Sequence, residues 1–218
     1  MIELPVSEFT VPYSSKQIDT FLACDIYGDK ETCSTLILHG GGKGTRERFL
    51  PLRSALLEAG HSTLAIDFVG HGKTGGDLNK SSLASRTEQS LTLLESLKDL
   101  PIRCILGTSM GAYNAIKLSC KYKISTLVLM VPAVYTSKAY NLPFDSEFTK
   151  IISEPRSWDE SDAWNIISDF RGHIFIVGAG KDEVIPAEIP ARLYDCAVKA
   201  KKREIYWIPD SSHTFINY

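Results

Sequence analysis

The chain has 218 residues, of which 44% are hydrophobic and 23% are charged, a composition typical of a globular protein with one sizeable core. Its net charge is -2 and its densest basic cluster is only Lys199 to Arg203, so the charge pattern of a nucleic-acid-binding protein is missing. No run reaches the ~18 apolar residues of a membrane span, and the first residues lack a signal-peptide pattern, so we expect a cytoplasmic protein.

Two runs of alternating apolar and polar residues open the chain, at residues 9–13 and 20–28, and predict an antiparallel pair of strands. Beyond Gly28, short and almost wholly apolar runs alternate with segments of helical periodicity. The apolar runs are residues 35–39, 62–67 and 103–107, and the helical segments are residues 46–59, 81–97 and 110–121. This alternation is typical of an α/β fold, in which a mostly parallel sheet carries helices on both faces.

The segment 81–97 also has internal helix signals. Ser85 and Glu88 have the spacing of a capping box, and an apolar stripe follows the helical period. The stripe consists of Leu83, Leu91, Leu94 and Leu97.

A further strand is predicted at residues 125–131, after which the alternation stops until about residue 172. The interval 132–172 is rich in aromatic residues and too long for a plain connection, so we expect a short inserted lid. The sheet resumes at residues 173–178, followed by a helix at 187–199, whose exposed end would carry the basic cluster, and a last strand at 204–208. We therefore expect a single domain over residues 1–218.

The sequence Gly107-Thr-Ser-Met-Gly111 lies where a predicted strand becomes a predicted helix. A serine hydroxyl is a weak nucleophile and must be presented beside a base. A tight strand-to-helix turn can present Ser109, and its crowding explains the two flanking glycines. Gly111, Ala115 and Ser119 give the following helix one face of small residues, which allows it to lie close to a sheet.

A reaction at a carbonyl also needs hydrogen-bond donors for the oxyanion that forms. The N–H of Met110, directly after the serine, is one candidate. The loop His39-Gly-Gly-Gly42 follows a predicted strand and can supply the second, because N–H groups without a neighbouring Cβ can approach an oxyanion closely.

A base and an acid that orients it should lie at the carboxyl ends of later strands, since ligands of parallel sheets bind at that edge. Asp182 directly follows the predicted strand 173–178, and His213 follows the strand 204–208. Glu183 is an alternative to Asp182.

These motifs resemble the α/β-hydrolase superfamily of esterases, lipases and acyl-hydrolases, over nearly the whole length from Thr35 to His213. The resemblance also covers Asp67-Phe-Val-Gly-His-Gly72. It implies that Ser109 is the nucleophile, His213 the general base and acid, and Asp182 its orienting carboxylate. It implies that the N–H groups of Gly41 and Met110 are the oxyanion donors. Gly41 is preferred to Gly42 for its position directly after the His-Gly pair. The sequence departs from the family in two ways: only five residues follow His213, where a helix is usual, and the lid is short for a lipase.

Two other chemistries are excluded by spacing. Gly72-Lys-Thr74 suggests a phosphate-binding loop, but that loop needs a glycine where Asp67 stands. Asp67 and His71 are therefore expected to shape a loop beside the site. The five cysteines never have C-x-x-C spacing, and the histidines lack the spacing of a metal site, so we expect no disulfide, metal or cofactor. We expect the cysteines, Cys104 included, to be buried in the core.

The sequence therefore predicts a serine hydrolase that cleaves esters or related acyl bonds of a small molecule through an acyl-serine intermediate. A thioesterase, an aminopeptidase or a carbon–carbon bond hydrolase would use the same groups. The alternative from another class is a non-catalytic protein that binds a small molecule or a partner in an aromatic-lined crevice. We expect residues 132–172 to distinguish among substrates.

Overall fold

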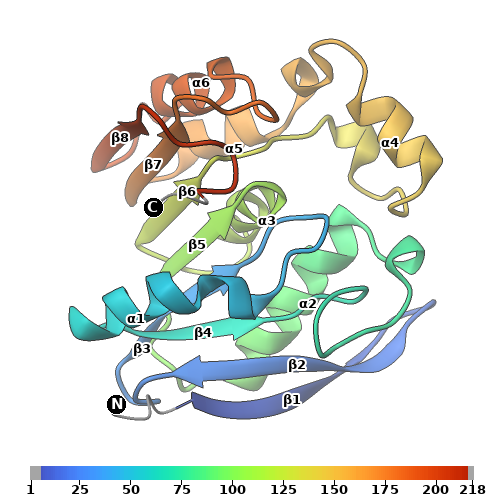
Figure 1. The fold of residues 1–218 in the computed structure, drawn as a ribbon, viewed down its shortest axis with the longest axis vertical. Helices are drawn as coiled ribbons and strands as arrows, with labels where there is room; N and C mark the ends of the chain where they lie inside the picture. The colour runs from blue at the N-terminus through green and yellow to red at the C-terminus, as the bar shows by residue number, and fades with distance from the viewer. Residues whose placement is uncertain (1–5, 216–218) are drawn as a thin grey trace.

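The computed structural model describes residues 6–215, and within them eight strands form one sheet (Figure 1). The strand order is β1-β2-β4-β3-β5-β6-β7-β8. β2 is antiparallel to β1 and β4, and all other neighbours are parallel. The strands are β1 Val6–Ser14, β2 Asp19–Tyr27, β3 Cys33–Leu38, β4 Ser62–Ile66, β5 Cys104–Thr108, β6 Thr126–Met130, β7 His173–Ala179 and β8 Lys202–Ile208. The predicted α/β architecture with an antiparallel N-terminal pair is confirmed.

Helices cover both faces of this sheet. The α-helices are α1 Leu50–Glu58, α2 Leu83–Ser96, α3 Met110–Ser119, α4 Ser146–Ile152, α5 Ala163–Asp169 and α6 Glu188–Cys196. The 3-10 helices are η1 Arg46–Phe49, η2 Leu78–Lys80, η3 Ser137–Ala139 and η4 Ser157–Glu160. Figure 1 looks onto the face that carries α1, with α2 and α3 behind the sheet.

The core is divided unequally between the two faces. The larger cluster packs the sheet against α2, α3, α5 and α6, and includes completely buried Leu36, Ile116 and Ile176. The smaller cluster lies under α1 and centres on Ile37 and Leu106. Each fully buried leucine or isoleucine contributes about 2 kcal/mol through removal of apolar surface from water. The alternation along a buried strand thus fixes both layers of helices.

Two predicted helices have different limits in the structure. The segment 46–59 is divided into η1 and α1, because Pro51 lacks an N–H and its ring excludes a continuous helix through that position. The helix predicted at 187–199 ends at Cys196, and part of the basic cluster opens β8 instead of ending the helix.

The predicted capping box at Ser85 and Glu88 is wrong. The N-cap of α2 is Ser82, three residues before the predicted cap Ser85. The Ser85 N–H donates to Ser82 Oγ at 3.0 Å, and the Ser82 N–H donates to Ser85 Oγ at 2.8 Å. A serine hydroxyl in the third helical position can accept the same hydrogen bond as a glutamate, so Glu88 is not required.

Residues 132–172 form η3, α4, η4 and α5, and much of their aromatic content faces the core. Phe148, Trp164 and Phe170 are buried in the larger cluster. The role of this segment as a lid stays a prediction.

The cysteines are free thiols of differing exposure. Cys24 and Cys33 are buried, and burial raises the pKa of Cys33 to about 11. Cys104 is half-buried in β5, where desolvation likewise raises its pKa to about 11, so its thiolate is disfavoured. The expectation of burial is wrong for Cys120, which is exposed just after α3.

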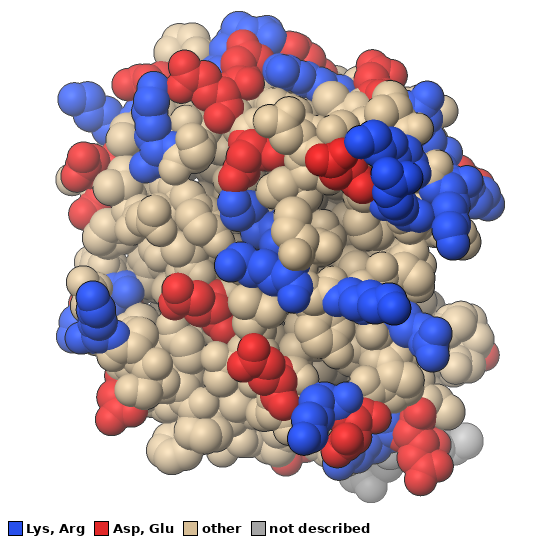
Figure 2. All heavy atoms as spheres, turned by 180° about the vertical axis from the view of Figure 1, so that it is seen from behind, with Lys and Arg blue, Asp and Glu red and all other residues tan. Residues whose placement is uncertain are grey.

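The face opposite α1 carries Lys and Arg side chains interspersed with Asp and Glu (Figure 2). Ion pairs join some of them, as between Lys199 and Asp169 at 2.6 Å. None of the helices within residues 6–215 is both long and apolar enough to cross a membrane. The last three residues after Phe215, where a closing helix was expected to be shortened or missing, lie outside the described part of the chain.

Candidate active site

Ser109 occupies the turn between β5 and α3. Its backbone has φ 50° and ψ -120°, a conformation that residues other than glycine rarely adopt. Its neighbours have no space for larger side chains. A Cβ at Gly107 would lie 2.3 Å from the carbonyl oxygen of Gly111, and a Cβ at Gly111 would lie 2.4 Å from that of Leu38. The crowding proposed from the sequence therefore has a specific origin: α3 begins directly against the end of β3.

The backbone of Ser109 is also held from the β6 side. Its N–H donates to the carbonyl of Met130 at 2.9 Å, and its own carbonyl accepts from the Ala133 N–H at 3.2 Å. The strained turn is therefore fixed at both polar groups, and its side chain is presented in one direction.

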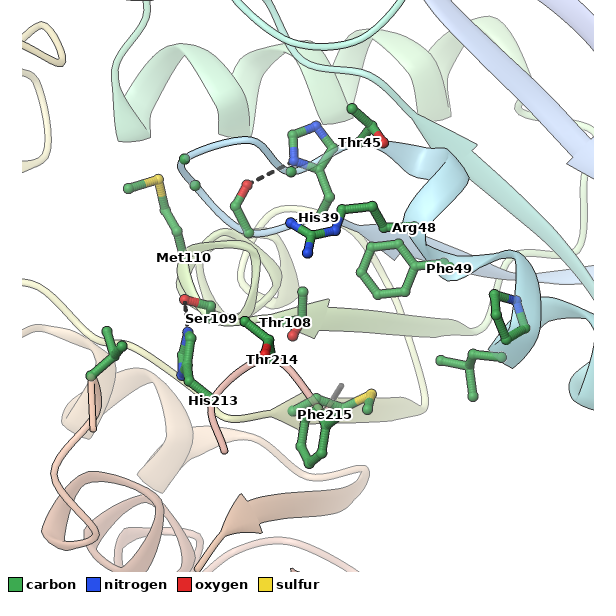
Figure 3. A pocket seen from close by; sticks show the side chains of 18 of the residues that line it. His39, Thr45, Arg48, Phe49, Thr108, Ser109, Met110, His213, Thr214 and Phe215 are labelled. Carbon is green, nitrogen blue, oxygen red and sulfur yellow. Dashed lines mark hydrogen bonds between the residues drawn. The ribbon is translucent and has the colours of Figure 1, made fainter. Parts of the chain in front are cut away.

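His213 lies between Ser109 and Asp182 (Figure 3 shows the contact with Ser109). The Nε2 atom of His213 is 3.0 Å from Ser109 Oγ. Its Nδ1 atom is 3.1 Å and 3.0 Å from Oδ1 and Oδ2 of Asp182. An ionised carboxylate can only accept, so Nδ1 carries the proton and Nε2 is left to accept from the serine hydroxyl.

Asp182 is itself oriented by its own loop. Its Oδ1 accepts from the N–H groups of Val184 and Ile185 at 2.9 Å and 2.8 Å. Its side chain is only 6% exposed and that of His213 13%. Glu183, the alternative acid, is exposed, whereas both carboxylate oxygens of Asp182 contact the imidazole.

The loops after β7 and β8 are joined by main-chain hydrogen bonds, which place Asp182 and His213 together. The N–H of Gly180 donates to Ile208 O and that of Lys181 to Ser211 O, both at 2.9 Å. The carboxyl ends of adjacent parallel strands therefore supply both residues, as their positions in the sequence suggested.

The glycine loop after β3 lies against the Ser109 turn. A Cβ on Gly40 would be 3.2 Å from Ser109 Cβ, and one on Gly41 would be 3.0 Å from the end of the Met110 side chain. Gly42 has open space at that position. Among the described residues, the N–H groups of Gly41 and Met110 have no acceptor, so both remain free to donate to a ligand.

Arg86, which sequence reasoning missed, holds this loop from behind. Its side chain is fully buried, with Nη2 donating to the carbonyls of His39 at 2.5 Å and Gly40 at 3.1 Å, and its guanidinium lies 4.0 Å from the Phe68 ring centroid. Burial lowers the pKa of Arg86 to about 9, so it is still a cation at neutral pH. The sequence did contain a signal for a buried arginine, because Arg86 lies three residues after Leu83 and so shares its face of the predicted helix.

His39 is buried next to Arg86. Its Nδ1–H donates to the Gly40 carbonyl at 2.7 Å, and its Nε2 accepts from the Phe68 N–H at 3.2 Å. Burial, and secondly the charge of Arg86, holds the pKa of His39 well below its ordinary value. His39 is thus a neutral structural residue of the loop.

Asp67 shapes the neighbouring loop, as expected from the sequence. Its Oδ1 accepts from the Arg46 N–H at 2.8 Å, and its Oδ2 accepts from the Lys73 N–H at 3.0 Å. The Arg46 side chain is 1% exposed and pairs through Nε with Asp25 at 3.0 Å, while Arg53 pairs with Asp25 at 2.5 Å. This buried cluster fixes the start of η1.

A cavity of about 770 Å³ opens in front of Ser109 (Figure 3). Its walls are mainly the glycine loop, η1 with the start of α1, and the segment after β8. The apolar lining residues include Phe49, Leu52, Met130, Tyr135, Ile208 and Phe215. Among the described lining residues, Tyr135 alone comes from residues 132–172, and the expectation that this segment distinguishes among substrates stays a prediction.

The aromatic segment instead contributes to a second, smaller cavity of about 200 Å³ on the far side of the glycine loop. Phe144, Phe148 and Thr149 line it, together with Gly41 and Met110, which also line the large cavity. The two cavities therefore share the wall that carries the two free N–H groups.

Comparison with known families identifies the fold and its class. Residues 30–157, more than half of the chain, match the family described as serine aminopeptidase, S33. The chain belongs to this α/β-hydrolase family. The matched segment includes the glycine loop and Ser109 but ends before Asp182 and His213.

The relatives of this α/β-hydrolase are distant. It is 24% identical over 82% of its length to an uncharacterized protein of Mycobacterium tuberculosis, of which it spans 62%. It is 28% identical over 44% of its length to the 2-hydroxy-6-oxononadienedioate/2-hydroxy-6-oxononatrienedioate hydrolase of Escherichia coli, of which it spans 35%. The chain thus spans less than two thirds of both.

Solved structures share the fold at low identity. An esterase of Pyrococcus furiosus has a TM-score of 0.72 and 20% identity, with 96% of this chain and 84% of that chain covered. Est1E of Butyrivibrio proteoclasticus, solved with ferulic acid bound, has a TM-score of 0.71 and 20% identity, with coverages of 91% and 90%.

Proposed function

We propose that this α/β-hydrolase cleaves carboxylic esters or related acyl compounds through an acyl-serine intermediate. The observation that carries the proposal is the chain of contacts from Ser109 Oγ through the two nitrogens of His213 to Asp182, each 3.0–3.1 Å long. An imidazole placed in this way can accept the serine proton while its other nitrogen keeps its hydrogen bond to a carboxylate.

Acylation begins when Ser109 Oγ attacks the carbonyl carbon and its proton passes to Nε2 of His213. The tetrahedral oxyanion is stabilised by the N–H groups of Gly41 and Met110, and by the positive end of α3. The intermediate collapses as the imidazolium protonates the leaving oxygen, which departs as an alcohol. Asp182 stabilises the imidazolium during these steps without taking its proton.

Deacylation repeats the sequence with water as the nucleophile. Nε2 of His213 takes a proton from water, the hydroxide attacks the acyl carbon, and the second tetrahedral intermediate releases the carboxylic acid. The proton returns to Ser109 Oγ. The two N–H donors serve both intermediates, and each is expected to contribute about 10²–10³ in rate.

The cavity favours esters over the amides of an aminopeptidase. An aminopeptidase must bind a cationic terminal amine, for which a carboxylate is the usual partner. Among the described residues that line the large cavity there is no Asp or Glu, and the lining is mainly apolar. The Pyrococcus furiosus esterase and the ferulic acid complex of Est1E share the fold and support the same substrate class.

The test is labelling of the serine combined with ester turnover. A fluorophosphonate probe should label the wild type at Ser109, and Ser109→Ala should lose labelling and hydrolysis of 4-nitrophenyl butyrate while keeping the same melting temperature within a few degrees. Ser125→Ala, at an exposed serine beside the start of β6, is the matched control and should behave as wild type.

Two results would contradict the proposal. One is a Ser109→Ala variant that retains wild-type turnover. The other is a folded wild type that neither labels nor hydrolyses any ester, thioester or amide of a broad panel. The second result, together with stabilisation by a small molecule, would instead support a non-catalytic binding protein.

A further inference from the structure

Arg48 is the single formally charged side chain, histidines aside, among the described residues that line the large cavity. It belongs to η1, and its guanidinium extends from that element toward the side of the cavity where Ser109 lies (Figure 3). The remaining lining is apolar or neutral. A ligand in this cavity therefore meets one positive charge and no negative one.

The guanidinium of Arg48 has no ion pair or hydrogen bond with any other described residue. Its neighbours differ in this respect. Arg46 pairs with Asp25 and Glu8, and Arg53 pairs with Asp25. The cationic groups that stabilise this part of the fold are thus neutralised within the chain, whereas Arg48 is available to a ligand.

The backbone that carries Arg48 is fixed relative to the site. The Arg48 N–H donates to the Thr45 carbonyl at 3.3 Å, and the Arg46 N–H donates to buried Asp67. Phe49, the next residue, packs into the cluster under α1 beside Ile37 of β3. A guanidinium on a fixed base loses less conformational entropy when it binds a ligand than one on a free loop.

The apolar surface near Arg48 extends the same site. Phe49, Leu52 and Met130 line the cavity together with it. A substrate that fits has an apolar part for these side chains and an oxyanion for the guanidinium. The planar fork of Arg suits a carboxylate, with which it can form two parallel hydrogen bonds.

We propose that Arg48 is a specificity-determining residue that binds a carboxylate of the substrate, so that the enzyme prefers anionic esters to neutral esters of equal size. This inference rests on the proposed ester hydrolysis at Ser109. The carboxylate can belong to the acyl part or to the leaving group, and both place an anion opposite the same cation.

The test compares matched esters. 4-Nitrophenyl hemisuccinate carries its carboxylate on the acyl part, 4-carboxyphenyl butyrate carries it on the leaving group, and phenyl butyrate and 4-nitrophenyl butyrate are the neutral counterparts. We expect one of the two anionic esters to exceed its neutral counterpart in kcat/KM. Arg48→Gln should lower that ratio about tenfold, chiefly through KM, which is roughly the effect of one charge-assisted hydrogen bond. Arg48→Lys should retain part of the preference for the anionic ester, because it keeps the positive charge.

Lys43→Gln is the control for general electrostatics. Lys43 is an exposed cation of the adjacent loop and is not among the residues lining the cavity, so its replacement should leave the ratio unchanged. Equal ratios in wild type and Arg48→Gln, or an equal loss in Lys43→Gln, would overturn the assignment to Arg48.

Binding can be measured without turnover in the Ser109→Ala background. Calorimetric titration with both anionic esters should show one of them binding about tenfold more weakly when Arg48→Gln is added. Unchanged affinity for both would overturn the proposal about Arg48. Absent labelling and turnover in the wild type would contradict the proposed reaction instead, so the two failures are distinguishable.

Discussion

At the scale of single residues, Arg86 shows how a side chain that does not face the cavity can determine the geometry of the glycine loop. The carbonyls of His39 and Gly40 both point to its guanidinium, which fixes the peptide planes from which the Gly41 N–H projects. No carboxylate partners this buried cation, and two of its nitrogens, Nε and Nη1, have no hydrogen-bond partner. A buried charge with such incomplete compensation is costly, which points to a positioning role.

Replacement of Arg86 should separate binding from the chemical step. Arg86→Met removes the guanidinium that donates to the carbonyls of the glycine loop, so the Gly41 N–H loses its fixed position. Because the proposed role of this N–H is to bind the oxyanion of the transition state, we expect kcat to fall roughly 10- to 100-fold with KM little changed. Arg86→Lys should recover part of kcat. Steady-state kinetics with 4-nitrophenyl butyrate measures both, and Arg103→Met, at an exposed arginine, is the control. A rise in KM at constant kcat would indicate a role in substrate binding instead.

At the scale of elements, the site depends on the approach of α3 to β3. The small residues at the start of α3 allow the helix to begin within contact distance of the Leu38 and His39 carbonyls. This closeness brings the N-terminal end of α3 and the glycine loop to the same place. The close approach of α3 to β3 thus places Ser109 and the N–H groups of Gly41 and Met110 together.

Gly111→Ala tests this dependence. The added methyl would lie 2.4 Å and 2.6 Å from the carbonyl oxygens of Leu38 and His39, so the helix must move away from β3. A displacement of ~1 Å can cost about 10² in rate, and overpacking of this kind destabilises by about 1–3 kcal/mol. We expect a loss of kcat of that size and a lower urea midpoint, with Cys120→Ala as the control just beyond the same helix. Wild-type kcat in Gly111→Ala would show that close packing is not needed.

The sequence could predict those elements whose periodicity is set by burial, and the limits are physical. β3, β4 and β5 are buried on both faces, so their apolar runs stand out. The position of Ser109, Asp182 and His213 after strands follows from the parallel order. The walls of the cavity could not be predicted in this way, because η1 and the loop after β8 have no periodicity and their contacts are non-local. Arg86 was missed because its helix face is apolar only in part.

At the scale of the whole molecule, the two faces of the sheet have different tasks. The face of α2, α3, α5 and α6 contains most of the core, whereas the face of α1 has a small core and borders the large cavity. Beyond β6 the α1 face is only half-covered: Phe175 and Val177 of β7 are half-buried and Tyr206 of β8 is 53% exposed. Stability is therefore concentrated behind the sheet and ligand access in front of it.

Behind the glycine loop, burial of two histidines makes the stability of the fold depend on pH. His39 and His71 are 1% and 5% exposed, with ring centroids 4.7 Å apart, and burial followed by the charge of Arg86 lowers the pKa of both below 6.5. Well above pH 6.5 both are neutral in the folded and the unfolded chain. Below it the unfolded chain takes up protons that the folded chain does not, so the free energy of unfolding must fall as the pH decreases.

We therefore expect the free energy of unfolding to fall between pH 6.5 and 5 by up to about 1.4 kcal/mol per pH unit for each buried histidine. Urea unfolding across this range measures the slope. His71→Gln should reduce the slope by up to one proton, because the proton that the unfolded chain would bind at this position is removed. His61→Gln, at an exposed histidine before β4, should leave the slope unchanged. An unaltered slope in His71→Gln would mean that His71 is protonated to the same extent in the folded and unfolded chain, contrary to its burial beside Arg86.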